Sequence, residues 1–309
     1  MKILVTGGAG FIGSHIVDGF VNEGHRVIVV DNLTSGKKEY LNSEAVFYKA
    51  DIQNRDEVAR IIRIEKPEVI NHHAAQISVR ESVADPVNDA RINIIGLLNL
   101  LEEGRSHNLK KVIFASSGGV VYGDAGRIPT PEDYEPKKPL SPYGVAKLAC
   151  EYYLNIYYRT YNISYIALRY SNVYGPRQNP HGEAGVVAIF SKKLLSGKTP
   201  VINGTGKQTR DYVFVADVAG ANMLALTSEF NGGVNIGTQI ETTVNKIYNG
   251  LEKQVKSSLK PRYGQPKQGE QNRSCLNIRF AKKVLGWTPQ VNLSDGLNKT
   301  VNFFRLQQS

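Results

Sequence analysis

The sequence has little cysteine and no long apolar run. Only two cysteines, Cys150 and Cys275, occur among its 309 residues, which argues against a disulfide framework and favours a reducing compartment. No apolar run approaches the roughly 18 residues that suggest a membrane span. The first strand is predicted to begin almost at Met1, so we expect no signal peptide. These absences predict a cytoplasmic protein without a membrane partner.

The charged residues form no concentrated patch. The chain carries 38 Lys and Arg against 28 Asp and Glu, a formal net charge of +10. The lysines occur as scattered pairs: Lys37-Lys38, Lys110-Lys111, Lys137-Lys138, Lys192-Lys193 and Lys282-Lys283. A basic stripe interleaved with aromatic residues would be typical of a nucleic-acid-binding face, and we find none. We expect no nucleic-acid partner, and a surface field that attracts a phosphate-rich substrate.

Metal-ligand spacing is also missing from the sequence. His72 and His73 are adjacent, but neighbours on a strand point to opposite faces, and no nearby Cys or carboxylate completes a ligand set. His181 lies in a predicted loop, where we interpret it as a polar loop group or a contact of the substrate lobe. We predict no metal site.

The predicted strands and helices alternate through the first half of the chain. Strands are expected at 1–6, 26–30, 45–49, 68–71, 111–115 and 164–169, and helices at 11–23, 55–64, 87–104 and 143–161. This alternation predicts an α/β fold with a parallel, doubly wound Rossmann sheet that binds ligands at the carboxyl ends of its strands. From about Ser171 the alternation breaks down. We predict a dinucleotide-binding domain at 1–170, and at 171–309 a smaller substrate-binding lobe with some segments returning to the first domain.

A glycine-rich turn joins the first strand to the first helix. Gly7, Gly10 and Gly13 leave room for a dinucleotide pyrophosphate to approach the backbone at the helix N-terminus. Asp31 ends the second strand, eighteen positions after Gly13, near the roughly 20-residue spacing of a ribose-binding carboxylate. This carboxylate would bond the ribose hydroxyls and repel a 2′-phosphate. The pattern therefore predicts NAD rather than NADP.

A tyrosine and a lysine are predicted to share one helix face. Tyr143 stands four residues before Lys147, so the phenol and the ammonium lie one turn apart. Lysine and the positive nicotinamide of NAD would both stabilise the phenolate, which makes Tyr143 a candidate general base. Ser117, at a predicted strand end, can bond the same substrate oxygen. The three residues beside a dinucleotide predict hydride transfer at a carbon that bears a hydroxyl.

With these motifs in view, the sequence resembles the UDP-glucose 4-epimerase branch of the extended short-chain dehydrogenase/reductase family. The matching stretches follow in the family's order over nearly the whole chain: TGGAGFIGSH, VVDNLTSG, NHHAAQ, ASSGGVVYG, SPYGVAKLACE, LRYSNVYGPRQ, NGTGKQTRDYVFVADVA, NIGT and KKVLGWTP. The resemblance implies a tightly held NAD, a nucleotide-sugar substrate and a homodimer built through two helices.

The resemblance also implies a set of binding residues. For NAD these are Gly7, Gly10, Phe11, Ile12 and Gly13 at the pyrophosphate; Asp31, Asn32, Thr34, Ser35 and Gly36 at the ribose; Asp51 and Ile52 at the adenine; and Ala74, Ala75, Gln76, Asn93, Ser116, Tyr143, Lys147 and Tyr170 elsewhere along the cofactor. For the UDP-sugar they are Ser117, Tyr143, Asn172, Arg210, Lys267, Glu270 and Ser274. Arg210 would clamp the diphosphate through its guanidinium fork.

Three positions depart from the family pattern. The family's catalytic Ser or Thr usually lies four residues before the VYG tyrosine, where this chain has Gly118, and we assign the role to Ser117 one residue earlier. Lys267-Gln268-Gly269-Glu270 replaces an Arg-x-Gly-Asp motif near the nucleotide, and lysine cannot reproduce the fork of arginine. His73 replaces a leucine in the cofactor loop.

The chemistry is expected to stop at epimerisation. Sugar 4,6-dehydratases of this family place an Asp-Glu pair before VYG, whereas this chain has Gly118, Gly119 and Val120 there. Alternatives are a uronate epimerase or decarboxylase, or a non-catalytic NAD- or RNA-binding relative, against which the intact Tyr143 and Lys147 speak.

In the family a bulky residue four positions after the nucleotide-contacting acid limits space at the sugar C2, and the small Ser274 predicts room for an N-acetyl group.

Overall fold

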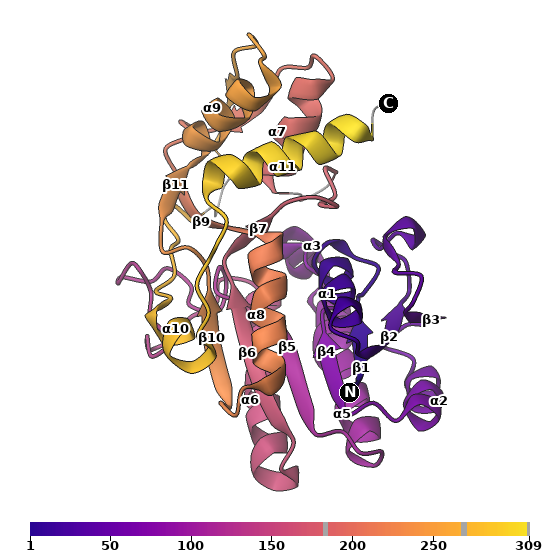
Figure 1. Ribbon diagram of the computed structural model, residues 1–309. Helices are drawn as coiled ribbons and strands as arrows, with labels where there is room; N and C mark the ends of the chain where they lie inside the picture. Colours follow the sequence, from indigo (N-terminus) through magenta and orange to yellow (C-terminus); the bar gives the residue numbers. More distant parts are fainter. Residues whose placement is uncertain (182–184, 267–270, 308–309) are drawn as a thin grey trace.

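A parallel sheet covered by helices on both faces forms most of the molecule (Figure 1). The computed structural model describes residues 1–181, 185–266 and 271–307. Within them the main sheet has the order β10-β6-β5-β4-β1-β2-β3, and all its pairs are parallel. Its strands are β1 (Lys2–Thr6), β2 (Arg26–Asp31), β3 (Val46–Lys49), β4 (Val69–His72), β5 (Lys111–Ser117), β6 (Ser164–Tyr170) and β10 (Gly232–Ile236). The predicted doubly wound fold is confirmed.

Two apolar layers hold the helices on the sheet. One face packs against α1 (Phe11–Asn22), α8 (Val215–Thr227) and α10 (Arg279–Leu285), and the other against α2 (Arg55–Glu65), α5 (Gly96–Arg105) and α6 (Pro142–Tyr161). The central strands are buried on both faces, as their continuous Val and Ile runs predict. Within the described residues no helix is long and apolar enough to cross a membrane.

Residues beyond 171 form a second lobe past the carboxyl ends of the sheet strands (Figure 1). It contains the sheet β11-β9-β7, with β7 (Asn172–Tyr174), β9 (Thr209–Phe214) and β11 (Glu241–Thr243), and the pair β8 (Val201–Asn203) and β12 (Arg262–Gly264). Its helices are α7 (Val186–Leu195), α9 (Val244–Val255) and α11 (Leu293–Leu306), which share one apolar core. Helices α8 and α10 and strand β10 return from this part of the sequence to the main sheet.

The helix predicted at 87–104 is interrupted. The chain forms α4 (Pro86–Ala90), then the π-helical turn η2 (Arg91–Ile95), then α5. The wider turn coincides with bonds made by Asn93, whose carbonyl accepts from the Cys150 thiol of α6 at 3.2 Å. The sequence analysis also missed the short helix α3 (Val79–Ala84) and the 3₁₀ turn η1 (Lys38–Tyr40).

Candidate active site

The turn between β1 and α1 needs its glycines. Gly7 has a φ of +68°, and a Cβ there would lie 2.7 Å from the Ala74 nitrogen. A Cβ on Gly13 would lie 2.2 Å from the Gly7 carbonyl oxygen, so helix and turn are in direct contact. Gly10 caps α1 without a side-chain bond, which leaves the amides at Phe11 and Ile12 facing the N-terminal end. This cradle, which any side chain would fill, fits a pyrophosphate.

Asp31 is fixed at the end of β2 beside this turn. Its carboxylate accepts from the Ala9 amide at 3.0 Å and from the Leu33 amide at 2.8 Å. Gly36 packs so closely that a Cβ would lie 2.9 Å from both carboxylate oxygens. The Lys37 amide donates to the Ala9 carbonyl at 2.9 Å, which closes the segment carrying Thr34 and Ser35 over the glycine turn. A carboxylate held this way can still accept bonds from ribose hydroxyls.

The residues implied at the adenine end lie on neighbouring loops. Asn32 donates to Asp51 through its side-chain amide at 3.0 Å and accepts from Thr34. Ile52 is buried against Gly96 of α5, and its carbonyl accepts from Asn99 at 2.9 Å. The carboxyl ends of β2 and β3 therefore bring these residues together.

The loop after β4 lies beside the glycine-rich turn that follows β1. The Ala74 amide donates to the Thr6 hydroxyl at 3.2 Å, and Ala75 follows it. Gln76 is clamped by Asn93, whose side-chain oxygen accepts from the Gln76 amide and whose nitrogen donates to the Gln76 carbonyl, both at 3.1 Å. Four of the sequence-predicted cofactor positions thus depend on the edge formed by β1, β4 and η2.

The helix that carries the candidate catalytic pair begins at a well-defined cap. Ser141 accepts from the Gly144 amide at 3.2 Å, and Pro142 occupies the first turn of α6. Lys147 lies one turn later, with its Nζ 5.7 Å from the centre of the Tyr143 ring, and it donates to the Ala115 carbonyl of β5 at 2.9 Å. The start of α6 is therefore anchored against the carboxyl end of β5.

Burial changes the proton affinity of both side chains. It lowers the pKa of Lys147 to about 8, although Cys150 and Asp89 act in the opposite direction. It raises the pKa of the Tyr143 phenol, and the negative charge of Asp89 raises it further. Tyr143 therefore stays protonated at neutral pH in the protein alone, and the positive charge of a bound nicotinamide would favour its phenolate.

Ser117 ends β5 at a tight turn. Its carbonyl accepts from the Val121 amide at 3.1 Å, and Gly118 donates its amide to Tyr170 at 2.9 Å. A Cβ on Gly118 would lie 2.5 Å from the Leu276 side chain, which explains why this position carries no hydroxyl. Ser116 is buried and donates to Glu151 at 2.5 Å, so its hydroxyl is already engaged inside the protein.

Tyr170 and His73 form a stacked pair behind the cofactor loop. Their ring centres lie 5.9 Å apart, and His73 Nε2 shares a hydrogen bond with the Tyr170 hydroxyl at 3.0 Å. Burial, followed by the charge of Lys147, lowers the pKa of His73 to about 3, so this imidazole is neutral. His72 lies on the other side of the strand, where its Nδ1 contacts Thr6 at 2.6 Å. Each histidine therefore has a structural partner of its own.

Two of the implied substrate residues lie on adjacent strands of the second lobe. Asn172 pairs with Tyr212 in the β7–β9 register, and Arg210 lies two residues earlier on β9, hence on the same face. Ser274 is buried beside β9, with its amide donating to Thr209 at 3.2 Å. Lys267 and Glu270 lie outside the described residues.

The sequence analysis missed a buried polar network under this site. Arg169 of β6 pairs with Glu151 of α6 at 2.6 Å, and its side chain also donates to the Tyr122 hydroxyl at 2.8 Å. Glu151 in turn accepts from Ser116. The single charged residue Arg169 in the otherwise apolar run of β6 was the available signal, and it does not reveal which element supplies the partner.

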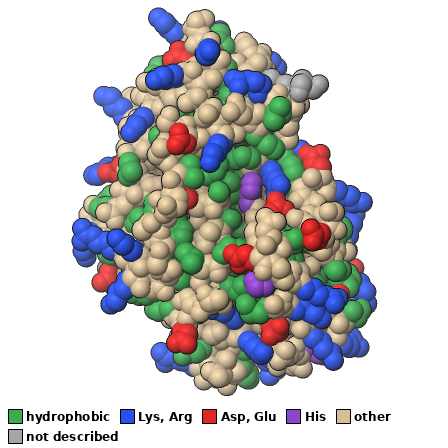
Figure 2. All heavy atoms as spheres, viewed as in Figure 1, with side chains coloured by type: hydrophobic (Ala, Val, Ile, Leu, Met, Phe, Trp, Pro, Cys, Tyr) green, Lys and Arg blue, Asp and Glu red, His purple; other side chains and the backbone are tan. Residues whose placement is uncertain are grey.

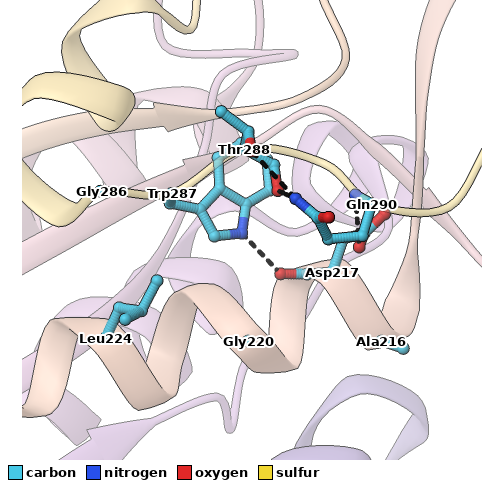
Figure 3. A pocket seen from close by; sticks show the side chains of 8 residues that line it. All are labelled: Ala216, Asp217, Gly220, Leu224, Gly286, Trp287, Thr288 and Gln290. Carbon is cyan, nitrogen blue, oxygen red and sulfur yellow. Dashed lines mark hydrogen bonds between the residues drawn. The ribbon is translucent and has the colours of Figure 1, made fainter.

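A small pocket of about 230 Å³ lies elsewhere, on the outer side of α8 (Figure 3). Its lining includes Leu224, Trp287 and Gln290 but none of the candidate site residues. The Trp287 indole donates to the Asp217 carbonyl at 2.9 Å, and the Asp217 carboxylate accepts from the Gln290 amide at 3.0 Å. These bonds hold the loop after α10 against α8, so the polar groups that line this pocket have a structural role.

Comparison with known proteins agrees with these observations. The model of the NAD dependent epimerase/dehydratase family matches residues 3–237. The chain is 46% identical over 312 residues to a UDP-glucose 4-epimerase of Mycolicibacterium smegmatis, covering 99% of each. A UDP-glucose 4-epimerase from Thermotoga maritima, solved with UDP-glucose, superposes with a TM-score of 0.98 at 48% identity over 100% of both chains. One from Thermus thermophilus, solved with NAD, gives 0.93 at 41% identity over 99% of each.

Proposed function

The chain belongs to the NAD dependent epimerase/dehydratase family, and we propose that it epimerises a UDP-sugar at C4, interconverting UDP-glucose and UDP-galactose. The observation that carries this function is the Tyr143–Lys147 pair at the start of α6, anchored on Ala115 beside the dinucleotide cradle. A phenol that can lose its proton next to a hydride acceptor is suited to reversible alcohol oxidation. UDP-sugar and NAD are the ligands of the neighbouring structures.

In the proposed reaction Tyr143 takes the proton of the sugar 4-hydroxyl and later returns it. A bound NAD would be held by the glycine cradle and Asp31 and would supply a reversible hydride acceptor for C4 of the sugar. Lys147 stabilises the phenolate, and Ser117 holds the substrate oxygen by a hydrogen bond. Arg210 and Asn172 bind the diphosphate and leave the sugar free to rotate. The net change is inversion at C4 without consumption of cofactor.

The turn that follows Ser117 offers no group for dehydration. The turn after Ser117 consists of Gly118, Gly119 and Val120, which offer neither an acid nor a base. A 4-keto sugar bound there can therefore be reduced again, but these three residues cannot remove water across C5 and C6.

The direct test is to incubate the purified holoprotein with UDP-, dTDP- and GDP-linked sugars and to identify the products. Conversion of UDP-glucose to UDP-galactose, and the reverse, is expected. Decarboxylation or inversion of a UDP-uronate without activity on UDP-glucose would show that the chain is a uronate decarboxylase or epimerase instead.

Cofactor choice tests the role of Asp31. We expect NAD to copurify with the protein, and Asp31→Asn to improve NADP binding relative to NAD by roughly tenfold, because a like charge no longer faces the 2′-phosphate. Mass spectrometry of the released cofactor and competitive titration measure both effects. Finding mainly NADP on the unmodified protein would remove Asp31 from the site.

Substrate breadth tests Ser274. We expect the small side chain to admit N-acetylated UDP-sugars, and Ser274→Tyr to suppress their turnover while UDP-glucose and UDP-galactose still interconvert, because a steric block acts on the group it excludes. Ser274→Ala is the matched control and should preserve both activities. Equal losses on both substrate pairs, or none on either, would show that another residue limits the pocket.

A second copy of the chain is the proposed partner of α6. The outer side of this helix exposes Val145, Tyr152 and Ile156, while Val87 of α4 and Ile95 of η2 expose apolar side chains next to it. Such a row at helical spacing suits a helix-to-helix homodimer. Ile156→Arg should produce monomers in sedimentation, whereas Ile64→Arg on α2, at a side chain of similar exposure, should not. A dimer unaffected by Ile156→Arg would exclude this face.

We place the enzyme in the cytoplasm. Cys150 and Cys275 are both buried as free thiols, as suits a reducing compartment.

On the face drawn in Figure 2, the Lys and Arg side chains are scattered and interspersed with acidic ones, without a continuous basic stripe. This face therefore does not have the charge pattern typical of a nucleic-acid-binding surface.

A further inference from the structure

A carboxylate that the reaction scheme does not use lies beneath the catalytic pair. Asp89 of α4 is only 1% exposed. Its Oδ1 accepts from the side-chain amides of Gln76 at 2.9 Å and Asn93 at 3.0 Å. Its Oδ2 is buried without a hydrogen-bond partner among the described residues. An isolated buried carboxylate is costly, so its retention needs an electrostatic reason.

The charged neighbours of Asp89 supply that reason. Burial raises the pKa of the Asp89 carboxyl, while the hydrogen bonds from Gln76 and Asn93 and the positive charge of Lys147 act in the opposite direction. Helix α4 packs against α6, and Asp89 in turn favours the protonated form of Lys147. The same negative charge acts on the Tyr143 phenol and the Cys150 thiol. Other charged groups on the adjoining elements are either exposed, as are Arg80, Glu81, Asp85 and Arg91, or, like Glu151, engaged with Arg169.

The surrounding backbone is built to keep the carboxylate in place. The π-helical turn η2 carries Asn93, which binds both Asp89 and the backbone of Gln76. Gln76 belongs to the loop proposed to line the cofactor path. One buried carboxylate therefore joins the loop after β4, the turn η2 and the electrostatic environment of α6.

We propose that Asp89 is a positioning residue for the epimerase site: it holds Gln76 and Asn93 in register and supplies the buried negative charge that controls proton sharing between Tyr143 and Lys147. In the cofactor-bound enzyme this charge balances the ammonium of Lys147. Asp89 itself touches no reacting atom and acts through its two neighbours. The inference deepens the proposed function and rests on it.

The direction of the pH effect follows from the sign of the charge. Removing the negative charge makes it easier for Tyr143 to lose its proton and for Lys147 to lose its own, so the pKa values of both groups fall. Asp89→Asn should therefore move both limbs of the pH profile of kcat/KM to lower pH, by on the order of one pH unit. A structural role alone would lower the maximum and leave the limbs in place.

Asp89→Asn is a mild substitution, because the Asn oxygen can still accept from Gln76 and Asn93. The matched control is Asp85→Asn at the exposed N-cap of the same helix, where Asn caps as well as Asp. The control removes one charge from the same element and should leave the profile unchanged. A displaced profile in Asp89→Asn alone is the expected result; unmoved limbs, or an equal shift in the control, would overturn the proposal.

A second measurement does not depend on turnover. The ultraviolet absorbance of phenolate, taken as the difference between each protein and its Tyr143→Phe derivative in the NAD-bound form, follows the ionisation of Tyr143 directly. The pH at the midpoint of this ionisation should be lower in Asp89→Asn, and an unchanged midpoint would refute the electrostatic role of Asp89. If this midpoint moves while no UDP-sugar is epimerised by the unmodified protein, the proposed function fails and the role of Asp89 stands.

Discussion

Replacing Tyr143 with Phe should lower turnover by roughly 10²-fold or more while NAD remains bound, the loss typical of removing a general base. The substitution keeps the ring that packs beside Lys147 and removes only the ionisable oxygen. Turnover is measured by conversion of UDP-glucose at saturating substrate. Cofactor retention is measured by the absorbance of NAD released on denaturation.

The control for this substitution is Tyr158→Phe, later on the same helix. Tyr158 is partly exposed and its ring contacts Tyr165 rather than the candidate site. Its loss of a hydroxyl should leave turnover within about twofold, since surface changes of this kind have small effects. Near-normal turnover in Tyr143→Phe would remove Tyr143 as the base, and loss of NAD from that variant would point to a structural role instead.

The sequence predicted the parts of the site that depend on local patterns. The glycines at 7, 10 and 13, the strand-ending Asp31 and the Tyr143–Lys147 spacing each belong to one short segment, and the parallel sheet brings those segments to one edge. Ser117 was assigned to its role against the usual register of the family. The crowding of Gly118 against Leu276 gives a steric reason for that shift.

Features that depend on tertiary contacts were not predicted. The π-helical turn η2 interrupts an otherwise regular apolar pattern, and the bonds of Asn93 to Gln76 and Cys150 that accompany it join three segments distant in the sequence. Ser116 is predicted to contact the cofactor, and the sequence did not show that its hydroxyl binds Glu151 in the core. No periodicity in one segment reports the partner that another segment supplies.

The buried pair below β5 offers the largest expected effect on stability. The side chains of Arg169 and Glu151 are 7% and 8% exposed, and Arg169→Met would leave the Glu151 carboxylate buried with Ser116 as its remaining polar partner. We expect the free energy of unfolding to fall by about 3–5 kcal/mol, the range measured when one partner of a buried ion pair is removed. Urea unfolding at a fixed NAD concentration measures the loss, because bound cofactor itself shifts the midpoint.

Two further variants distinguish the loss of the Arg169–Glu151 ion pair from the loss of side-chain packing. Arg273→Met breaks the exposed pair with Glu241, in which Arg273 is 60% exposed, and should lower the stability much less than Arg169→Met does. The double variant Arg169→Met with Glu151→Leu should be more stable than Arg169→Met alone, because it removes the uncompensated carboxylate. If the two substitutions in the pair simply add, or if Arg169→Met costs no more than Arg273→Met, then desolvated charge is not what couples β6 to α6.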